Sequence, residues 1–309
     1  MKVRFSSFWP GSDRTILNFF VPLLVESLGS NIEIEKREDS LVDLEVTSVY
    51  PKKLSRFNSF MNFAKKKDAK GWPAAENAKI RIWFSGENIR PPLDEEFDLY
   101  LSFDSTNSEK KTFYLPLWVL NLNWFEKPSA HGFISKYNRQ HELLKTRRIE
   151  HLALNNRNFC CVFANHLDNR RRSAISSLSK LGNVDIYGGA GRMSVSDKFE
   201  IARNYNFILC FENSFYPGYV TEKLLEAYQT TAFPLYWGHD HFGFFNQDTF
   251  LNFANYDSEI TILSIIEDLM KDFQLYKSKL EMPLLKKAYD FEALKTRIGA
   301  SLEKNVNKN

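Results

Sequence analysis

Cysteine is scarce in this chain, and the few cysteines present form no recognisable pattern. Only Cys160, Cys161 and Cys210 occur among 309 residues. An odd count with two adjacent members provides no disulfide framework, so buried thiols in a reducing compartment are expected. The six histidines have no CxxC or HxxxH spacing around them, and the sequence therefore predicts no structural zinc site.

Long hydrophobic runs are missing as well. The longest apolar stretch near the start, residues 16–25, contains Asn18 and Pro22 and has about half the length that a membrane span needs. The opening residues MKVRFSSFWPGSD lack the apolar region of a signal peptide. We therefore expect a cytoplasmic protein with no transmembrane segment. Weak peripheral association with the inner face of a membrane is the alternative.

A charge excess of one sign is the third missing feature. The chain has 41 basic and 38 acidic side chains, a net charge of +3. This balance argues against a nucleic-acid partner, which needs a strong basic field. Aromatic residues, in contrast, reach 15% of the chain, with 27 Phe, 13 Tyr and 6 Trp. Their flat rings suit a core and also suit walls for sugars and bases.

Short apolar runs alternate with helical patterns, first loosely and then regularly. In the first third we expect a helix over 15–28, interrupted by Pro22, and strands at 2–8, 41–50, 79–84, 97–103 and 113–120. In the second half we expect strands at 159–164, 184–187, 206–211 and 233–237, joined by helices at 172–181, 197–203 and 221–230. The order β-α-β-α-β-α-β predicts a parallel sheet with right-handed crossovers, in an α/β protein.

Length and polarity divide the chain into two expected domains. A chain of 309 residues favours two domains, and the polar, charged segment 121–157 lies between the two apolar patterns. We place the boundary between residues 154 and 155.

Residues that could bind a ligand or take part in catalysis follow the strands of the second half, at the ends of the strands where parallel sheets bind their ligands. The loop that begins at Glu212 is long, and Thr221 is the expected N-cap of the next helix. Lys223 then lies in the first helical turn, where a cation is disfavoured unless an anion such as a diphosphate meets it. The alternative for Lys223 is simple exposure to solvent.

Two further strand ends have weaker signals. The turn Gly188-Gly189-Ala190-Gly191 could approach a phosphate closely, although it lacks the GxGxxG spacing and an ordinary glycine-rich turn is the simpler interpretation. Arg170, Arg171 and Arg172 could clamp a diphosphate, with one or two of them facing solvent.

The second half carries a long ordered motif. It consists of Phe211-Glu212-Asn213-Ser214, then Tyr219-Val220-Thr221-Glu222-Lys223-Leu224, then Pro234-Leu235-Tyr236-Trp237-Gly238. This motif resembles that of the α-1,3/1,4-fucosyltransferases. The segment Phe84-Ser85-Gly86-Glu87-Asn88 is similar to the part that carries the family's proposed catalytic carboxylate. The resemblance covers about residues 80–255.

The resemblance implies a fold and a reaction. The fold would be GT-B, with two Rossmann-like domains facing a cleft. Residues 1–154 would bind the acceptor and residues 155–309 would bind GDP-β-L-fucose, with C-terminal helices packing back on the first domain. The enzyme would be an inverting, bacterial-type α-1,3-fucosyltransferase acting on the GlcNAc of a β-galactosyl-N-acetylglucosamine (N-acetyllactosamine-type) acceptor. The fucosylated products of such an enzyme would be Lewis antigens on lipopolysaccharide, or glycans on proteins.

The resemblance also implies roles for individual residues. Lys223 would contact the diphosphate and Glu222 the hydroxyls of the donor, while Asn213 and Tyr219 would complete the nucleotide-sugar pocket. The family's arginine lies seven residues before a helical leucine. This spacing selects Arg171, seven residues before Leu178, although Arg170 and Arg172 flank it.

The chemistry requires a base, for which Glu87 is the candidate. It lies just past an expected strand, whereas the competing carboxylates Asp94, Glu95 and Glu96 form an acidic run typical of a solvated loop. Arginine and lysine that contact the leaving diphosphate would make a metal ion unnecessary, and no DxD motif follows a strand.

A non-catalytic nucleotide-sugar or glycan-binding module is the alternative function. The choice between α-1,3 and α-1,4 linkage and the oligomeric state stay open.

The C-terminal segment has apolar residues at helical spacing. We expect a helix over 284–300 that packs back on the N-terminal domain, with a membrane-surface helix as the alternative.

Overall fold

The structure is a computed structural model, and it divides the chain into two compact units. The residues described are 1–50, 77–92, 97–104, 111–125, 138–150, 156–191, 195 and 197–306. Unit 1 comprises Met1–Leu120, Phe125–Ile134 and Asp290–Asn309. Unit 2 comprises Asn121–Trp124 and Ser135–Tyr289. Unit 2 thus begins upstream of the boundary expected at 154/155, and the C-terminal segment is grouped with unit 1.

Unit 1 is built on a six-stranded parallel sheet with the order β2-β1-β3-β4-β5-β6. The strands are β1 (Lys2–Ser6), β2 (Glu33–Ile34), β3 (Val42–Thr47), β4 (Ala78–Phe84), β5 (Leu99–Ser102) and β6 (Thr112–Tyr114). The strand expected at 113–120 is therefore wrong in its second part, because the chain leaves the sheet after Tyr114 and forms the 3-10 helix η2 (Leu117–Asn121).

Pro22 divides the first helical segment into three consecutive pieces. These are α1 (Asp13–Thr15), the π-helix η1 (Ile16–Phe20) and α2 (Val21–Leu28). Proline lacks an N–H donor and disfavours the interior of a regular helix. Here Pro22 lies in the first turn of α2, and the wider π turn before it lets the Val21 N–H reach the Ile16 carbonyl. Helix α2 ends at Gly29, whose φ of 60° is left-handed.

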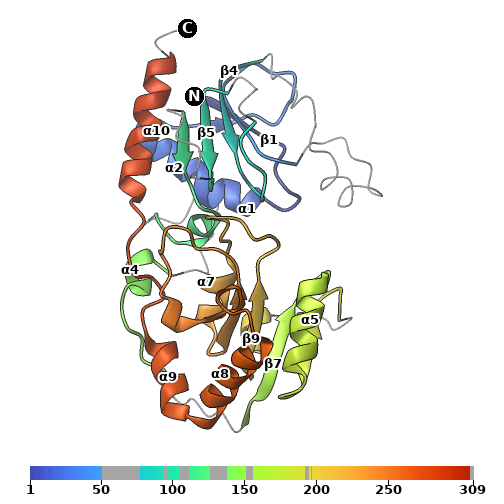
Figure 1. Ribbon diagram of the computed structural model, residues 1–309. Helices are drawn as coiled ribbons and strands as arrows, with labels where there is room; N and C mark the ends of the chain where they lie inside the picture. Colours follow the sequence, from blue (N-terminus) through green and yellow to red (C-terminus); the bar gives the residue numbers. More distant parts are fainter. Residues whose placement is uncertain are drawn as a thin grey trace. The chain divides into compact units, whose positions relative to one another are not determined.

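The C-terminal helix α10 (Phe291–Val306) packs against α2 within unit 1 (Figure 1). The Phe291 ring lies 5.8 Å from the ring of Phe19, and Lys295 pairs with Glu26 at 2.7 Å. The expectation of a single helix over 284–300 is wrong for its first turns. Leu285 instead donates its N–H to the Leu143 carbonyl and forms a bridge with Phe245 in unit 2.

Much of the aromatic content of unit 1 is in its core. Phe84 at the end of β4 lies 4.8 Å from Phe20 and 6.0 Å from Phe8, measured between ring centroids. A second group surrounds Trp83, which is completely buried. These rings therefore stabilise the sheet by burying large apolar surfaces, as many aromatic side chains do.

Unit 2 has a five-stranded parallel sheet with the order β11-β10-β9-β7-β8. Its strands are β7 (Asn158–Phe163), β8 (Val184–Tyr187), β9 (Tyr205–Phe211), β10 (Phe233–Trp237) and β11 (Leu251–Asn252). Its helices are α4 (Gln140–Leu143), α5 (Asn169–Leu178), α6 (Lys198–Ala202), α7 (Lys223–Gln229), α8 (Glu259–Lys271) and α9 (Phe273–Glu281), with the 3-10 turns η4 (Gln247–Thr249) and η5 (Phe253–Asn255).

The strand order of unit 2 reverses between β7 and β9. The chain runs from β7 to its neighbour β8 on one side, and then crosses to β9 on the other side of β7. Such a switch point leaves a crevice at the carboxyl ends of the two strands, which is where open α/β sheets bind ligands. The predicted order of strands and helices over residues 159–237 is confirmed, and all three cysteines are free and buried.

Candidate active site

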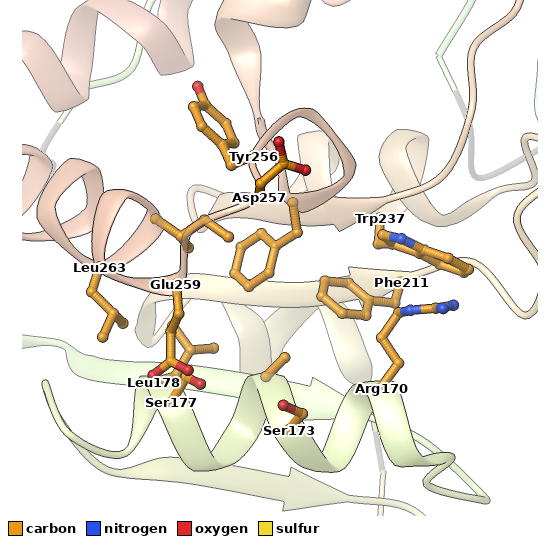
Figure 2. A pocket seen from close by; sticks show the side chains of 13 residues that line it. Arg170, Ser173, Ser177, Leu178, Phe211, Trp237, Tyr256, Asp257, Glu259 and Leu263 are labelled. Carbon is orange, nitrogen blue, oxygen red and sulfur yellow. The ribbon is translucent and has the colours of Figure 1, made fainter.

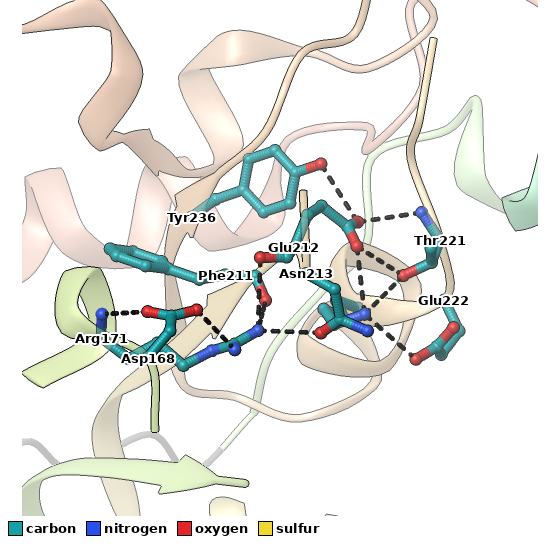
Figure 3. Close-up of polar contacts among 9 residues, drawn as sticks. Asp168, Arg171, Phe211, Glu212, Asn213, Thr221, Glu222 and Tyr236 are labelled. Atoms are coloured by element: carbon teal, nitrogen blue, oxygen red, sulfur yellow. Dashed lines mark hydrogen bonds and ion pairs between the residues drawn. The ribbon is translucent and has the colours of Figure 1, made fainter. Parts of the chain in front are cut away.

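Arg171 is held above the switch point by contacts on both sides of it. Asp168, the N-cap of α5, accepts hydrogen bonds from the Arg171 backbone N–H at 2.8 Å and from its Nη1 at 3.0 Å. Arg171 Nη2 donates to the carbonyl oxygens of Phe211 at 2.7 Å and Glu212 at 3.2 Å, and to Asn213 Oδ1 at 3.0 Å (Figure 3). The side chain is 13% exposed. Arg171 thus joins the end of β7 to the end of β9.

The two neighbouring arginines have other partners. The Arg170 guanidinium lies 3.6 Å above the Trp237 ring, and Arg172 Nε donates to the Leu167 carbonyl at 3.1 Å. The three arginines, which the sequence left as alternatives, are therefore distinguished by the fold. Arg171 is the arginine that binds Phe211 at the end of β9 and the two residues after it.

Lys223 lies at the start of α7 and is bound to a buried carboxylate. Its Nζ is 3.0 Å from Glu212 Oε2 and 2.8 Å from Thr221 Oγ1 (Figure 3). Burial by itself lowers the pKa of Lys223, but the negative charges of Glu212 and Glu222 outweigh it and raise the pKa above its usual value. Lys223 is therefore a firmly protonated cation whose side chain is 20% exposed.

Thr221 is not the N-cap that the sequence predicted. The N-cap position of α7 is Glu222, and no side chain caps the helix there. Thr221 instead donates its backbone N–H to Glu212 Oε1 at 2.9 Å and its hydroxyl to Glu212 Oε2 at 2.7 Å. The reason is that the preceding loop brings Thr221 over the end of β9, where the stronger charged acceptor is available.

Glu222 is more exposed than the neighbouring Glu212, with 38% of its side chain accessible. Its Oε1 lies 3.5 Å from Lys223 Nζ. Burial acts to raise the pKa of Glu222, but the charges of Lys223 and Lys198 and the hydrogen bonds of the carboxylate outweigh it, and the pKa lies below its ordinary value. Glu222 is thus an ionised acceptor at the surface of the site.

Asn213 and Tyr219 lie at different depths. Asn213 is exposed and binds Arg171 through Oδ1. Tyr219 is 1% exposed, and its backbone N–H donates to the Tyr216 carbonyl at 3.0 Å. Tyr219 is therefore buried, whereas Asn213 is at the surface of the same loop.

Glu87 lies in unit 1, three residues after the end of β4. Its Oε1 accepts a hydrogen bond of 2.7 Å from the Tyr50 hydroxyl. Burial, together with this bond to a carboxylate, raises the pKa of Tyr50, so the phenol keeps its proton and remains a donor. The competing carboxylates Asp94, Glu95 and Glu96 lie outside the described residues.

Close packing explains the glycine-rich turn after β8. A Cβ atom on Gly191 would lie 1.7 Å from the Ile186 carbonyl oxygen, and one on Gly188 would lie 2.9 Å from the Ala164 carbonyl oxygen. Gly188 also has a φ of 89°. The simpler interpretation of this turn is therefore sufficient, since both glycines are required sterically.

A cavity of about 230 Å³ lies between α5 and α8 in unit 2 (Figure 2). Arg170 contributes to its wall together with the Trp237 ring on which it stacks. The remaining lining residues are Ser173, Ala174, Ser177, Leu178, Phe211, Phe253, Tyr256, Asp257, Glu259, Ile262 and Leu263. The sequence did not predict this cavity, because it is formed by side chains from segments about 90 residues apart.

Across the described ranges, no three His, Cys, Asp or Glu side chains are grouped in a way that could hold a metal ion. Nor does any helix in those ranges have the length and apolar character needed to cross a membrane.

Comparison with a family model decides which family the site belongs to. Residues 153–291 match glycosyltransferase family 10 (fucosyltransferase), C-terminal part. This segment is similar to the C-terminal part of the family 10 fucosyltransferases. It contains the switch point and its two cations, and the resemblance seen in the sequence is confirmed.

Curated relatives of the fucosyltransferase domain agree with this assignment. The α-(1,3)-fucosyltransferase FucT of Helicobacter pylori is 27% identical over 246 residues, which is 71% of this chain and 51% of the relative. The human 3-galactosyl-N-acetylglucosaminide 4-α-L-fucosyltransferase FUT3 is 30% identical over 116 residues, which is 36% of this chain and 32% of the relative. The chain thus spans about half, or less, of the relatives' lengths. Both relatives are named as fucosyltransferases.

Solved structures confirm the fold class. An α1,3-fucosyltransferase crystal structure with GDP-fucose has a TM-score of 0.68 and 19% identity, covering 98% of this chain and 90% of that one. Another α1,3-fucosyltransferase structure has a TM-score of 0.70 and 21% identity, covering 99% and 89%. The two parallel-sheet α/β units therefore have the GT-B fold that the sequence predicted.

Proposed function

We propose that this chain transfers L-fucose from GDP-β-L-fucose to a sugar hydroxyl with inversion, giving an α-L-fucoside. The observation that carries the proposal is that two cations meet on one residue at the switch point. Arg171 binds the main-chain oxygen of Glu212, and Lys223 binds its carboxylate. Two fixed positive charges at a strand end suit a diphosphate, and both curated relatives described above are fucosyltransferases.

The proposed reaction is a single displacement. The acceptor oxygen attacks C1 of fucose, its proton goes to the Glu87 carboxylate, and the bond from C1 to the β-phosphate oxygen breaks. GDP leaves with the bonding electron pair. Arg171 and Lys223 would stabilise the charge that develops on the leaving phosphate, a contribution that is often the largest in such catalysis. Proton transfer to Glu87 would add about 10²–10⁴ in rate.

The remaining predicted residues would complete the donor site. Glu222, ionised and 38% exposed, can accept hydrogen bonds from donor hydroxyls. Asn213 would fix Arg171 and contact the nucleotide sugar directly. Tyr219, with 1% exposure, would complete the nucleotide-sugar pocket by holding the loop to which it belongs.

We propose an N-acetyllactosamine-type acceptor and an α-1,3 linkage to its GlcNAc. The acceptor would bind the N-terminal part of the chain, residues 1–154, which contains Glu87, and the donor would bind residues 155–309. The names of the relatives support the acceptor class and include both 3-α- and 4-α-fucosyltransferases. The α-1,4 linkage therefore remains the alternative. Synthesis of Lewis-type surface glycans by a cytoplasmic enzyme would be the corresponding cellular role.

A two-acceptor assay tests both the reaction and the linkage. Galactose occupies O4 of GlcNAc in Galβ1-4GlcNAc and O3 in Galβ1-3GlcNAc, so each acceptor leaves one of the two positions open. Incubation with GDP-fucose should release GDP and fucosylate the Galβ1-4 acceptor at O3, with an α anomeric signal by NMR. Fucosylation of the Galβ1-3 acceptor alone would establish the α-1,4 alternative. Binding of GDP-fucose with no transfer to any β-galactosyl-GlcNAc acceptor would instead indicate a non-catalytic module.

A further inference from the structure

Glu212 is a completely buried carboxylate at the centre of the donor site, and the functional roles above do not include its side chain. It directly follows β9, and its side chain has no exposed surface. Oε1 accepts from the Thr221 N–H at 2.9 Å and the Tyr236 hydroxyl at 3.2 Å, and Oε2 accepts from the Thr221 hydroxyl at 2.7 Å and Lys223 Nζ at 3.0 Å (Figure 3). A buried charge is costly unless it is paired in this way.

The contacts of Glu212 determine how Lys223 can bind a ligand. A lysine ammonium has three N–H donors. Glu212 and the Thr221 hydroxyl accept two of them, which fixes Nζ above the end of β9. Glu222 Oε1, at 3.5 Å, is beyond ordinary hydrogen-bond distance. One N–H of a fixed ammonium is therefore available to an anionic oxygen.

We propose that Glu212 is the positioning residue for Lys223, and that it acts on donor binding through this lysine. The inference rests on the proposed function, in which Lys223 contacts the diphosphate of GDP-fucose. Lysine has a long, flexible side chain, so an unanchored ammonium would sample many positions. The Glu212 carboxylate removes this freedom before the nucleotide binds, and its carbonyl oxygen helps to hold Arg171 at 3.2 Å.

The same carboxylate keeps Lys223 charged. Burial lowers the pKa of Lys223 and so does the nearby charge of Arg171 on α5, whereas Glu212 and Glu222 raise it. Glu226 on α7 also faces Lys223, but it has its own partner in Lys198 on α6. Removing the Glu212 charge should therefore lower the pKa of Lys223.

Glu212→Gln keeps the shape of the side chain and removes its charge. We expect GDP affinity, measured by calorimetry, to fall about tenfold to a hundredfold, as is usual when a charge-assisted contact is lost. Tyr236→Phe is the matched control, because it removes another hydrogen bond to the same carboxylate and leaves Lys223 untouched. It should lower the melting temperature and change GDP affinity by less than about threefold.

Two further readouts separate positioning from a general loss of stability. In a Lys223→Met background, Glu212→Gln should cause no additional loss of GDP affinity, because the group through which it acts is gone. In the wild-type background, Glu212→Gln should make GDP binding weaken at a lower alkaline pH than in the unmodified protein, because the pKa of Lys223 is lowered. Because GDP titrates equally in both measurements, comparison with the pH profile of the unmodified protein corrects for titration of the nucleotide.

The outcomes distinguish this inference from the proposed function. If Lys223→Met leaves GDP affinity unchanged, the role of Lys223 in donor binding is wrong. If Lys223→Met weakens binding but Glu212→Gln does not, or if Glu212→Gln weakens it equally in both backgrounds, Glu212 is not a positioning residue. Should Glu212→Gln fail to fold, Thr221→Val tests the same network without removing the buried charge. It should weaken GDP binding several-fold, and unchanged affinity would overturn the inference.

Discussion

Arg171 and its neighbours show how strongly side-chain partners differ between adjacent positions. Asp168 and the residues after β9 hold the Arg171 guanidinium over the switch point. Arg170 stacks on Trp237 and Arg172 binds a carbonyl within its own loop. At the scale of single residues, one arginine of the three therefore shares the partner Glu212 with Lys223, which supports the proposed diphosphate contact of both cations.

Arg171→Ala is expected to weaken GDP binding about tenfold or more, since loss of one charge-assisted contact has this typical effect. Arg172→Ala is the matched control and should change the affinity by less than about twofold, as is usual for a surface charge. Calorimetry on Arg170→Ala, Arg171→Ala and Arg172→Ala completes the comparison. A larger loss for Arg170→Ala or Arg172→Ala than for Arg171→Ala would move the diphosphate contact to that residue.

Glu87→Gln is expected to reduce the rate of transfer by about 10²–10⁴, because the amide cannot accept the proton. GDP affinity should hardly change, since Glu87 belongs to the unit that lacks the two cations. Tyr50→Phe is the control for the local hydrogen bond of 2.7 Å and should have a much smaller effect on the rate. If Glu87→Gln turns over within a few-fold of the unmodified enzyme, the general base is another carboxylate. Glu95 and Glu96 are then the next candidates.

Helix α10 illustrates what decides stability at the scale of elements. Its Gly299 lies against α2, and a Cβ atom at this position would be 2.3 Å from the Ser27 carbonyl oxygen. The obstacle is backbone, so it cannot move aside as a flexible side chain would. The absence of a side chain at Gly299 therefore permits the two helices to approach closely.

Gly299→Ala should destabilise unit 1 by about 1–3 kcal/mol, the usual cost of overpacking a well-packed contact. Helix propensity alone predicts the opposite sign, a gain of about 1 kcal/mol for alanine. Glu303→Ala, at an exposed position of the same helix, should stay within about 0.5 kcal/mol. Urea unfolding measures the free energy of unfolding of the unmodified protein, Gly299→Ala and Glu303→Ala. A Gly299→Ala variant more stable than the unmodified protein would show that α10 does not pack as described.

The first residue of α5 differs from the one that the sequence pattern predicts. The charge pattern predicts a helix over 172–181 that follows a polar, basic connection. The structure begins it at Asn169, since the Asp168 carboxylate accepts the Arg171 N–H. The N-cap residue Asp168 thus decides the start of the helix, and the charge pattern does not.

For the whole molecule we predict that transfer does not require a metal ion. Arg171 and Lys223 would provide the positive charge that a metal supplies in other transferases. Activity after removal of divalent ions with EDTA should remain within about twofold of the untreated enzyme, measured as GDP release. Loss of activity with EDTA and recovery with Mn²⁺ alone would contradict the prediction. Modest stimulation by a divalent ion would be compatible with it, because GDP binds metals in solution.

The sequence by itself determined the class of the protein. Alternation of apolar strands with helices over residues 159–237 depends on signals within about ten residues, such as hydrophobic period and turn residues. The order of elements was predictable for this reason, and the motif from Phe211 to Gly238 gave the resemblance to fucosyltransferases that the family comparison supports for residues 153–291.

Only the tertiary structure decided which side chains meet. The bond from Arg171 to the Phe211 carbonyl spans 40 residues, and Lys295 pairs with Glu26 across 269. Such contacts depend on strand order, register and helix packing, which no local pattern encodes. Glu212 shows the consequence most clearly. In the sequence it is one acidic residue after an apolar strand, and burial beneath Thr221 and Tyr236 makes it the fixed partner of Lys223.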